Sequence, residues 1–240
     1  MIGLGTIINS AGIIAGGLIG LAAGKALKPK LRDSLTIAMG LCTLFIGGSG
    51  VLTEMLVYED GRFSTQGSMM MILSLVLGCI VGELVDIESA CERLGVWLKN
   101  KTGNGGDTRF VDAFVTASLT VCIGAMAVIG SIKDGISGDY SILATKAVLD
   151  LLIIIVMTAS MGAGCIFSVL PVAVFQGLIT LLARLIEPLM TDAAVSNLSL
   201  VGSVLIFCVG INLAFSRHIR VGNLLPAIIF AVAFAFVPML

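Results

Sequence analysis

Apolar segments of about twenty residues recur from one end of this sequence to the other. An α-helix rises about 1.5 Å per residue, so a segment of about twenty residues crosses the hydrocarbon core of a bilayer. Only 12% of the residues are charged, about half of the roughly 25% that a soluble domain carries. We therefore expect an integral membrane protein, and the soluble globular, disordered and disulfide-rich secreted classes are excluded.

The apolar segments predict an all-α fold, a polytopic transmembrane helix bundle of about eight spans in a single integral membrane domain that covers residues 1–240. One or more helices are expected to be broken or re-entrant, because the fifth and sixth spans meet at the uncharged sequence Gly162-Ala163-Gly164. The predicted spans are residues 2–24, 34–57, 68–84, 110–130, 141–161, 165–186, 198–216 and 224–240.

Lysine and arginine are distributed unevenly among the predicted loops. Cytoplasmic loops hold the excess of these residues, so their positions indicate the orientation of the chain. We predict a multi-pass protein with both termini outside, because most of the 14 basic residues then fall inside. The inside residues are Lys25, Lys28, Lys30, Arg32, Arg93, Lys99, Lys101, Arg109, Arg217 and Arg220; Arg62, Lys133 and Arg184 fall outside, and Lys146 lies within a span.

Residues 86–100 are too polar to span a bilayer but have the pattern of an amphipathic helix. Apolar residues recur there at three- and four-residue spacing opposite charged ones, and the single tryptophan, Trp97, is on the apolar side. We predict that this helix lies in the cytoplasmic headgroup layer. The alternative is a cytoplasmic helix that docks another subunit. The apolar side consists of Ile87, Ala90, Cys91, Leu94, Trp97 and Leu98.

Glycine makes up 29 of the 240 residues, and four glycines in the first span are spaced four residues apart. This spacing keeps them on nearly one helix face, where a neighbouring backbone can approach closely. The face predicts a tight helix contact, either with another helix of the same chain or as the seam of a homodimer. The four residues are Gly12, Gly16, Gly20 and Gly24.

Ionisable residues inside membrane spans are functional candidates, because an isolated charge is costly in hydrocarbon. Asp150 is the strongest candidate, since it lies near the middle of the fifth span, with Lys146 one turn before it on the same face. In the functional interpretation, Lys146 attracts an anion or keeps Asp150 charged, and Asp150 exchanges a proton during transport. In the structural interpretation, Lys146 reaches toward the interface and Asp150 joins two helices.

Uncharged polar residues at depth could line a path or form hydrogen bonds between helices. The candidates are Asn9, Ser168, Gln176 and Asn212. Gln176 stands out because it follows Pro171 by five residues, and a proline within a helix frees a carbonyl one turn earlier. Freed carbonyls that line a cavity form ion sites in transporters.

The segment from Gly130 to Ser141 contains three glycines and two aspartates, Asp134 and Asp139, at near-regular spacing. Glycine and aspartate in such a pattern favour tight turns. We expect either an outer loop or a re-entrant segment that presents backbone donors to a ligand. In the last loop, Asn223 is expected to cap a helix that has Pro226 in its first turn.

The chain resembles the YqgA/YdfK-like inner-membrane proteins of unknown function. The resemblance is carried by the residues 130–139, by Lys146, Asp150 and Gln176, and by Gly222-Asn223-Leu224-Leu225-Pro226-Ala227, and it extends from Gly5-Thr6 and Asn9 to the end of the chain. It implies a protein of the prokaryotic plasma (inner) membrane, of a kind often labelled a transporter without an established substrate.

These features favour a small-solute or ion transporter or channel, possibly proton-coupled, with the alternative of a membrane scaffold or assembly protein. The expected partners are the lipid bilayer and a small solute or ion, with a homodimer as a further option and no nucleic acid. We expect no enzyme activity, metal or cofactor, because the six cysteines are scattered without a CxxC pair and the one histidine, His218, is in a basic loop. The pathway candidates are Asp150, Lys146, Gln176, Asn9, Ser168, Asn212, Asp134 and Asp139.

Overall fold

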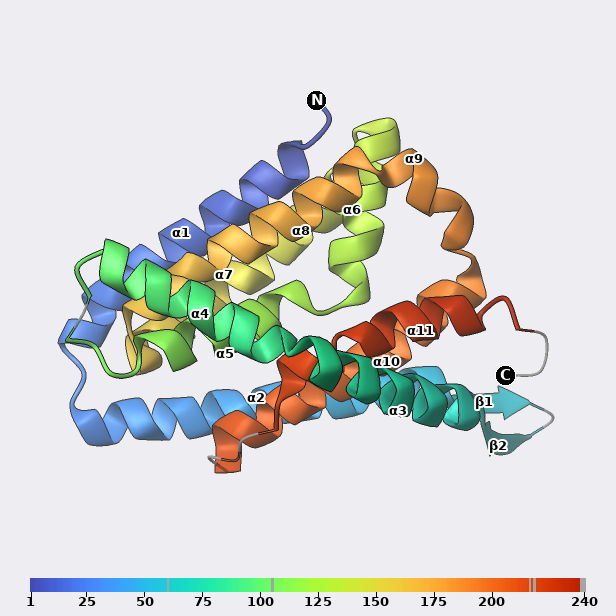
Figure 1. Ribbon diagram of the computed structural model, residues 1–240, viewed down its shortest axis with the longest axis horizontal. Coiled ribbons are helices and arrows are strands. Elements are labelled where there is room, and N and C mark those ends of the chain that lie inside the picture. Colours follow the sequence, from blue (N-terminus) through green and yellow to red (C-terminus); the bar gives the residue numbers. More distant parts are fainter. Residues whose placement is uncertain (60, 105, 216, 218, 238–240) are drawn as a thin grey trace. The chain divides into compact units, whose positions relative to one another are not determined.

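A computed structural model describes residues 1–59, 61–104, 106–215, 217 and 219–237. The described chain is almost entirely helical, with one short β-hairpin (Figure 1). His218 and the last three residues of the eighth predicted span lie outside the described residues. The α-helices are α1 (Leu4–Lys25), α2 (Pro29–Met55), α3 (Ser68–Val85), α4 (Ile87–Lys101), α5 (Phe110–Cys122), α6 (Ala125–Ser137), α7 (Ser141–Met161), α8 (Val169–Leu181), α9 (Ala183–Ile186), α10 (Asp192–Phe215) and α11 (Pro226–Phe234); the 3-10 helices are η1 (Ala163–Ser168), η2 (Glu187–Leu189) and η3 (Val221–Leu224); the strands are β1 (Leu56–Glu59) and β2 (Arg62–Thr65).

Most of these helices are long and apolar enough to cross a membrane. Among the described residues, six helical segments pass this test singly, and α5 and α6 pass it together although they are bent by 63°. The segment Val221–Phe234 is apolar but shorter. The all-α polytopic fold with a broken helix is therefore confirmed. The six segments are Leu4–Lys25, Pro29–Met55, Ser68–Val85, Ser141–Met161, Ala163–Leu181 and Asp192–Phe215.

The chain folds into two compact units, each built from two separate stretches of sequence. Unit 1 consists of residues 1–39 and 89–187, and unit 2 of residues 40–88 and 188–240. The helices α1 and α5 to α9 belong to unit 1, whereas α3, α10, α11 and the hairpin belong to unit 2. Because α2 and α4 each begin in one unit and end in the other, these two helices connect the units.

The central contact of unit 1 is a seam between α1 and α7. Backbone atoms of α7 lie directly against the four glycines of α1, so that a Cβ at Gly12 would be 3.0 Å from the carbonyl oxygen of Ala147 and one at Gly20 would be 2.5 Å from that of Ile155. The partners advance together along both helices, which therefore run parallel. Of the two predicted alternatives for the glycine face, the structure shows the contact with another helix of the same chain.

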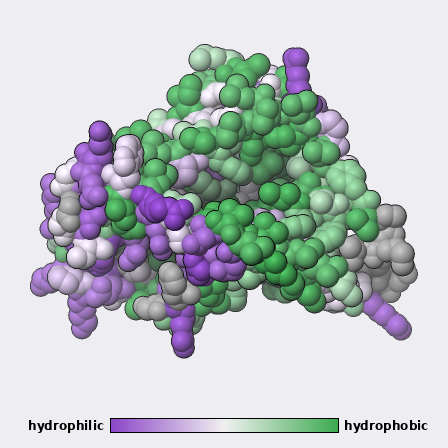
Figure 2. Space-filling view, in the orientation of Figure 1, coloured by the Kyte–Doolittle hydropathy of each residue, from purple (hydrophilic) through white to green (hydrophobic). Residues whose placement is uncertain are grey.

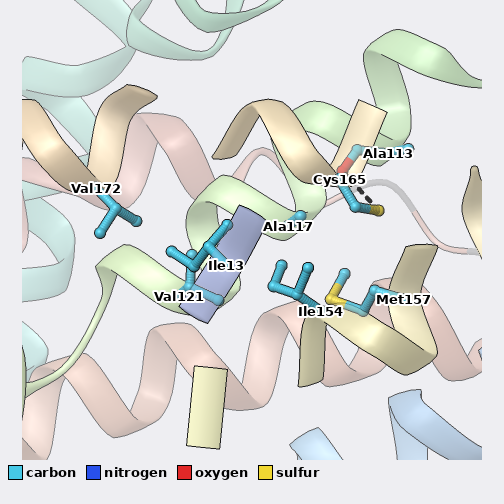
Figure 3. Packing of buried hydrophobic residues seen from close by; sticks show 8 residues of the cluster. All are labelled: Ile13, Ala113, Ala117, Val121, Ile154, Met157, Cys165 and Val172. Atoms are coloured by element: carbon cyan, nitrogen blue, oxygen red, sulfur yellow. Dashed lines mark hydrogen bonds between the residues drawn. The ribbon is translucent and has the colours of Figure 1, made fainter. Parts of the chain in front are cut away.

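An apolar cluster fills unit 1 beside this seam, as Figure 3 shows. It brings together side chains from α1, α5, α7, η1 and α8, and each is nearly inaccessible. The thiol of Cys165 lies 3.6 Å from the carbonyl oxygen of Ala113 within it. The cluster therefore forms a dry layer across the interior of unit 1. Its members are Ile13, Ala113, Ala117, Val121, Ile154, Met157, Cys165 and Val172.

The glycine-rich segment from Gly130 to Ser141 is mostly helix, which corrects the expected outer loop. The helix α6 continues through it to Ser137, and only Gly138, with φ +69°, makes a turn. Gly135 instead allows close packing, because a Cβ there would be 2.5 Å from that of Ala183. In a membrane, glycine serves helix contact as readily as turns.

The broken helix lies further upstream, between α5 and α6. The join at Gly162 is instead a change of direction between two complete spans, where Gly162 has φ +106° and η1 leads into α8. Pro171 lies in the first turn of α8, just after η1 passes into α8 and near the middle of the span Ala163–Leu181.

Glycine contacts also organise unit 2. Gly40 and Gly47 of α2 lie against the backbone of α10 at Ala214 and Phe207, so these two helices run antiparallel. Gly78 and Gly82 of α3 lie against the backbone of the segment η3–α11 in the same way. Close backbone packing through small residues is therefore common to both units.

The predicted amphipathic helix is present as α4. Leu98 is buried against Phe110 and Phe114 of α5, whereas Trp97 is 57% exposed. Hydrophilic side chains gather over α4 in Figure 2. This distribution agrees with a helix that has one polar and one apolar side.

We predict that alanine at Gly20 lowers stability, whereas alanine at Gly177 of α8 does not. Nothing lies within 4 Å of a Cβ at Gly177, in contrast to the overlap at Gly20. Overpacking costs about 1–3 kcal/mol, and the gain in helix propensity is the same in both variants. The thermal unfolding midpoints of the detergent-solubilised variants measure the difference. Equal midpoints would contradict the close seam between α1 and α7.

Candidate functional site

The centre of the candidate site is an ion pair on α7. The Lys146 ammonium contacts the Asp150 carboxylate one helical turn away, and the two residues are only 6% and 3% exposed. Asp150 is the tenth of the 21 residues of α7 and therefore lies near the middle of that span. An ion pair at this depth is neutral as a whole, which is what hydrocarbon tolerates best.

The break between α5 and α6 supplies a third polar group to this pair. Ile123 is extended and Gly124 has φ +143°, a conformation that residues with a side chain rarely adopt. The break leaves carbonyl groups at the end of α5 without partners in the helix. One of them, on Val121, accepts a hydrogen bond of 2.8 Å from Lys146 Nζ. The ammonium therefore lies between a carboxylate and the negative end of a half-helix.

Two buried amides accompany the ion pair, and both residues are 0% exposed. The Asn9 side chain of α1 lies within hydrogen-bonding reach of the Asp150 carboxylate. The Gln176 side chain belongs to α8, and neither its oxygen nor its nitrogen has a partner among the described residues. An unsatisfied amide in a protein interior is uncommon and calls for an explanation.

The polar residues form a layer directly above the apolar cluster. Asp150 lies one turn before Ile154 on α7, and Asn9 lies one turn before Ile13 on α1. On α8 the order is reversed, with Gln176 one turn after Val172, because α8 runs antiparallel to α1. Asp150, Asn9 and Gln176 therefore lie at a similar depth in unit 1, and all three are on the same side of the apolar cluster.

Polar groups continue from this layer toward the beginning of α1. The hydroxyls of Thr6 on α1 and Thr180 on α8 are buried and have no hydrogen-bond partner within the part of the chain that the structure describes. The buried Asp134 of α6 accepts hydrogen bonds from the amides of Gly3 at 3.2 Å and Gly5 at 2.9 Å. Unit 1 therefore has a polar half toward the beginning of α1 and an apolar half beyond the ion pair. The Asp134 carboxylate thus caps the beginning of α1. This role was not predicted, because Asp134 was expected in a loop or a re-entrant segment.

The remaining predicted pathway residues have structural partners. Asp139 is exposed before α7, and hydrogen bonds from the hydroxyl and amide of Ser141 hold the pKa of its carboxyl below the usual value. Ser168 donates to the carbonyl oxygen of Cys165 on the far side of the apolar cluster from Gln176. Asn212 belongs to unit 2, where both ends of its amide bond the backbone of Ile219.

Sequence reasoning missed the helix break and the Val121 carbonyl. The only signal was Gly124 within an apolar run, and single glycines are frequent in membrane helices. It also missed Thr6 and Thr180, since threonine is common in membrane spans and nothing local distinguishes these two.

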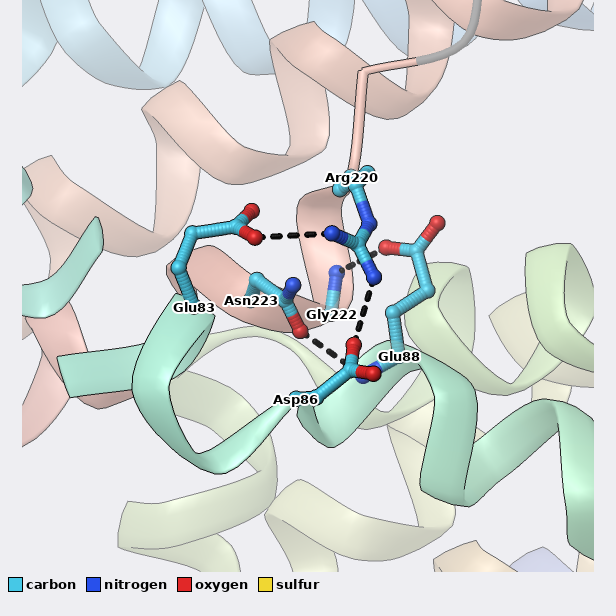
Figure 4. Close-up of polar contacts among 6 residues, drawn as sticks. All are labelled: Glu83, Asp86, Glu88, Arg220, Gly222 and Asn223. Atoms are coloured by element: carbon cyan, nitrogen blue, oxygen red, sulfur yellow. Dashed lines mark hydrogen bonds and ion pairs between the residues drawn. The ribbon is translucent and has the colours of Figure 1, made fainter. Parts of the chain in front are cut away.

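A second polar cluster occurs in unit 2, at the end of α3 (Figure 4). Arg220 forms ion pairs with Glu83 at 2.7 Å and with Asp86 at 2.5 Å. The side chains of all three are more than a third exposed, so water solvates them. This cluster is an interfacial clamp and a weaker candidate for a transport site.

Two buried hydrogen bonds complete the clamp. Glu88 of α4 accepts from the amide of Gly222 at 2.9 Å, and its own amide donates to Asn223 Oδ1 at 2.8 Å. Glu88 is buried, although the charged residues of this helix were expected on its polar side. Asn223 bonds α4 and not the helix that follows it, which corrects its expected capping role, while Pro226 does begin α11.

A polar pocket of about 420 Å³ in unit 2 is lined by ends of helices. Glu54 near the end of α2 accepts a hydrogen bond of 2.6 Å from Ser196, and Asp192 begins α10. Carboxylates at helix ends are open to interfacial water. The pocket therefore lacks the enclosure that distinguishes the ion pair of α7.

Comparison with known proteins gives a family and two relatives. The family described as "Protein of unknown function (DUF554)" matches residues 4–236. The "Uncharacterized membrane protein YdfK" of Bacillus subtilis (strain 168) is 28% identical and covers 97% of this chain and 96% of its own. The "Uncharacterized protein YqgA" of Escherichia coli (strain K12) is 26% identical and covers 95% of this chain and 94% of its own length. No solved structure matches the chain.

We predict that Lys146→Met destabilises the protein by about 3–5 kcal/mol, because it leaves the Asp150 carboxylate buried without a counter-charge. A second change, Asp150→Leu, should recover most of this loss. Lys133→Met at an exposed position of α6 is the matched control and should have little effect. Unfolding of the detergent-solubilised variants gives the coupling free energy of the pair. Equal stabilities of Lys146→Met and Lys133→Met would contradict a buried pair.

Proposed function

We propose that this protein, which belongs to the DUF554 family of membrane proteins of unknown function, moves a small solute or ion across the membrane. The proposed binding site is the polar layer of unit 1. The observation that carries the proposal is the buried pair of Lys146 and Asp150 at the break between α5 and α6. Broken helices whose ends face charged groups at mid-depth are the usual construction of transporter sites.

A purely structural role explains less of this arrangement. Two helices can be joined by one hydrogen bond between uncharged groups, which avoids the cost of transferring two charges out of water. Here α1 and α7 already pack through their glycine seam, so the ion pair is not needed to hold them together. The Gln176 amide, which has no partner among the described residues, adds unfavourable free energy to this state. A site whose polar groups bind a ligand during transport accounts for both the buried charges and the unsatisfied amide.

The ion pair is enclosed, so we interpret the observed conformation as an occluded state. The polar half of unit 1 leads from the pair toward Thr6 and the beginning of α1, which the distribution of charges predicts to be outside. The apolar cluster closes the other direction. Transport then requires each closure to open in turn, and the bend at Gly124 is a natural hinge for α6.

We propose further that transport is coupled to protons. Lys146 and Asp150 are a buried base and acid in direct contact, and both groups lie where the charge of a solute would be felt strongly. A solute that enters the layer would displace or recruit this proton. The prediction of a proton-coupled pathway therefore centres on the pair and does not involve Asp139, which is exposed.

We predict that Asp150→Asn abolishes proton-coupled flux while Asp139→Asn preserves it. Asparagine keeps the shape of the side chain but cannot balance the Lys146 charge or exchange a proton. The measurement is uptake of a panel of ions, amino acids and organic acids into vesicles that contain the purified protein, with a pH-sensitive dye inside. The expected loss is at least about tenfold, which corresponds to about 1.4 kcal/mol.

A proton dependence that Asp150→Asn leaves unchanged would remove Asp150 from the mechanism. If the folded protein moves no member of the panel, and the double variant Lys146→Met with Asp150→Leu retains both fold and cellular phenotype, the transport proposal fails. The alternative of a membrane scaffold would then account for the protein.

A further inference from the structure

We propose that the helix α4 carries a binding site for an anionic phospholipid, formed by Arg93, Trp97 and Lys101. These three residues, the Trp97 strip, follow one another at four-residue intervals and are all exposed. Residues four apart on a helix are neighbours on one face. The strip is separate from the polar layer of unit 1, so lipid binding there does not depend on transport.

The helix α4 keeps part of its apolar side uncovered. It packs on α5 through Gly95 and Leu98, since a Cβ at Gly95 would be 3.0 Å from the ring of Phe114 and Leu98 is buried against the same ring. Leu94 and Trp97 also belong to the apolar side but remain 40% and 57% exposed. An amphipathic helix beside membrane spans places such side chains in the lipid interface, where tryptophan is enriched.

Two cations flank Trp97 on this uncovered side. Arg93 lies one turn before the indole and Lys101 one turn after it, and neither forms an ion pair within the described part of the chain. Long basic side chains lay their stems along apolar surface and extend their charges toward the phosphate layer. The Trp97 strip therefore presents two positive charges around an apolar centre.

The rest of α4 does not cancel this charge. Glu92 lies five residues before Trp97 and Lys99 two residues after it, so with 3.6 residues per turn both are on the far side of the helix. Their opposite charges balance each other there. Glu88 is buried and accepts a hydrogen bond from the amide of Gly222. The net positive charge of α4 is thus concentrated on the Trp97 strip.

Further positive charge gathers at the same end of unit 1. Gly24 near the end of α1 lies against the last turn of α7, and the segment after α7 lies against Phe110 at the beginning of α5. Leu98 of α4 packs on Phe110 as well, so these helix ends meet. The sequence segments 25–33 and 101–112 at this end carry six basic residues and three aspartates. The surroundings of the Trp97 strip therefore also favour an anion.

These charges select an anionic phospholipid as the occupant. A zwitterionic lipid such as phosphatidylcholine presents a neutral headgroup, whereas phosphatidylglycerol carries one net negative charge. Each basic side chain near the surface of an anionic membrane contributes about a fivefold preference. The guanidinium of Arg93 can bind two phosphate oxygens at once, and Lys101 adds a point charge. The acyl chains would lie along Trp97 and Leu94.

A protein partner fits this surface less well. Two apolar side chains between two cations offer far less than the roughly 800 Å² that each partner contributes to a stable protein interface. The docking of another subunit, which the sequence left open for this helix, is therefore an alternative outcome of the test.

The test uses the fluorescence of Trp97, which is the single tryptophan of the chain and reports on this strip alone. The purified full chain is reconstituted into phosphatidylcholine vesicles, and the fraction of lipid that carries brominated acyl chains is increased. Brominated phosphatidylglycerol and brominated phosphatidylcholine are compared in parallel titrations. Half-maximal quenching should occur at a mole fraction at least about fivefold lower for phosphatidylglycerol, and high salt should reduce this preference.

Matched variants assign the preference to the strip. The double variant Arg93→Gln with Lys101→Gln should remove the preference, because both charges beside Trp97 are lost. Lys99→Gln removes one charge from the far side of the same helix and should retain it. All the changed positions are outside the apolar core, and circular dichroism checks that each variant remains helical.

Four results would overturn the lipid site. Equal quenching of the wild type by the two brominated lipids would reject the preference for an anion. A loss in Lys99→Gln as large as in Lys101→Gln would assign the preference to overall charge. Absence of quenching by either lipid would show that Trp97 does not contact lipid, as expected if another subunit covers it. Recovery of fluorescence on addition of soluble glycerol phosphate would identify a site for free phosphate esters.

Discussion

The cost of a charge in hydrocarbon is the constraint on which the arrangement of unit 1 depends. Asp150 is tolerated near the middle of α7 because Lys146 neutralises it, and the ammonium in turn needs the Val121 carbonyl that the helix break exposes. The carboxylate therefore requires the ammonium, and the ammonium requires the carbonyl. The bend between α5 and α6, which would be a defect in an ordinary span, is thus part of the same polar centre.

Close packing of the surrounding helices determines what else can reach this centre. The glycine seam holds α1 against α7 and so brings Asn9 to the level of Asp150. The apolar cluster then closes one side, and the buried hydroxyls of Thr6 and Thr180 lie on the other. A solute would therefore reach the polar layer more easily from the side of Thr6 and Thr180 than through the apolar cluster. Unit 2 has a different character, since its described ion pairs are at helix ends where water solvates them.

Sequence alone predicted the features that depend on local periodicity, and it failed where distant segments meet. Spacing of four residues was enough to pair Lys146 with Asp150 and to place the glycines of α1 on one face. The break at Gly124 depends on tertiary contacts that compensate the lost helical bonds, and no short pattern encodes them. The segment from Gly130 to Gly138 suggested a loop because glycine favours turns in water, whereas in a membrane glycine favours close contact between helices. The bonds between Glu88 and η3 join residues more than 130 positions apart.

An experimental density map of the protein in a lipid bilayer tests the central claim most directly. The account predicts the Lys146 ammonium between the Asp150 carboxylate and the Val121 carbonyl, with added density for water or a bound ligand in the polar layer beside Asn9 and Gln176. An ion pair surrounded by apolar side chains alone, without any added density, would contradict it and would leave the pair as a structural bond between helices.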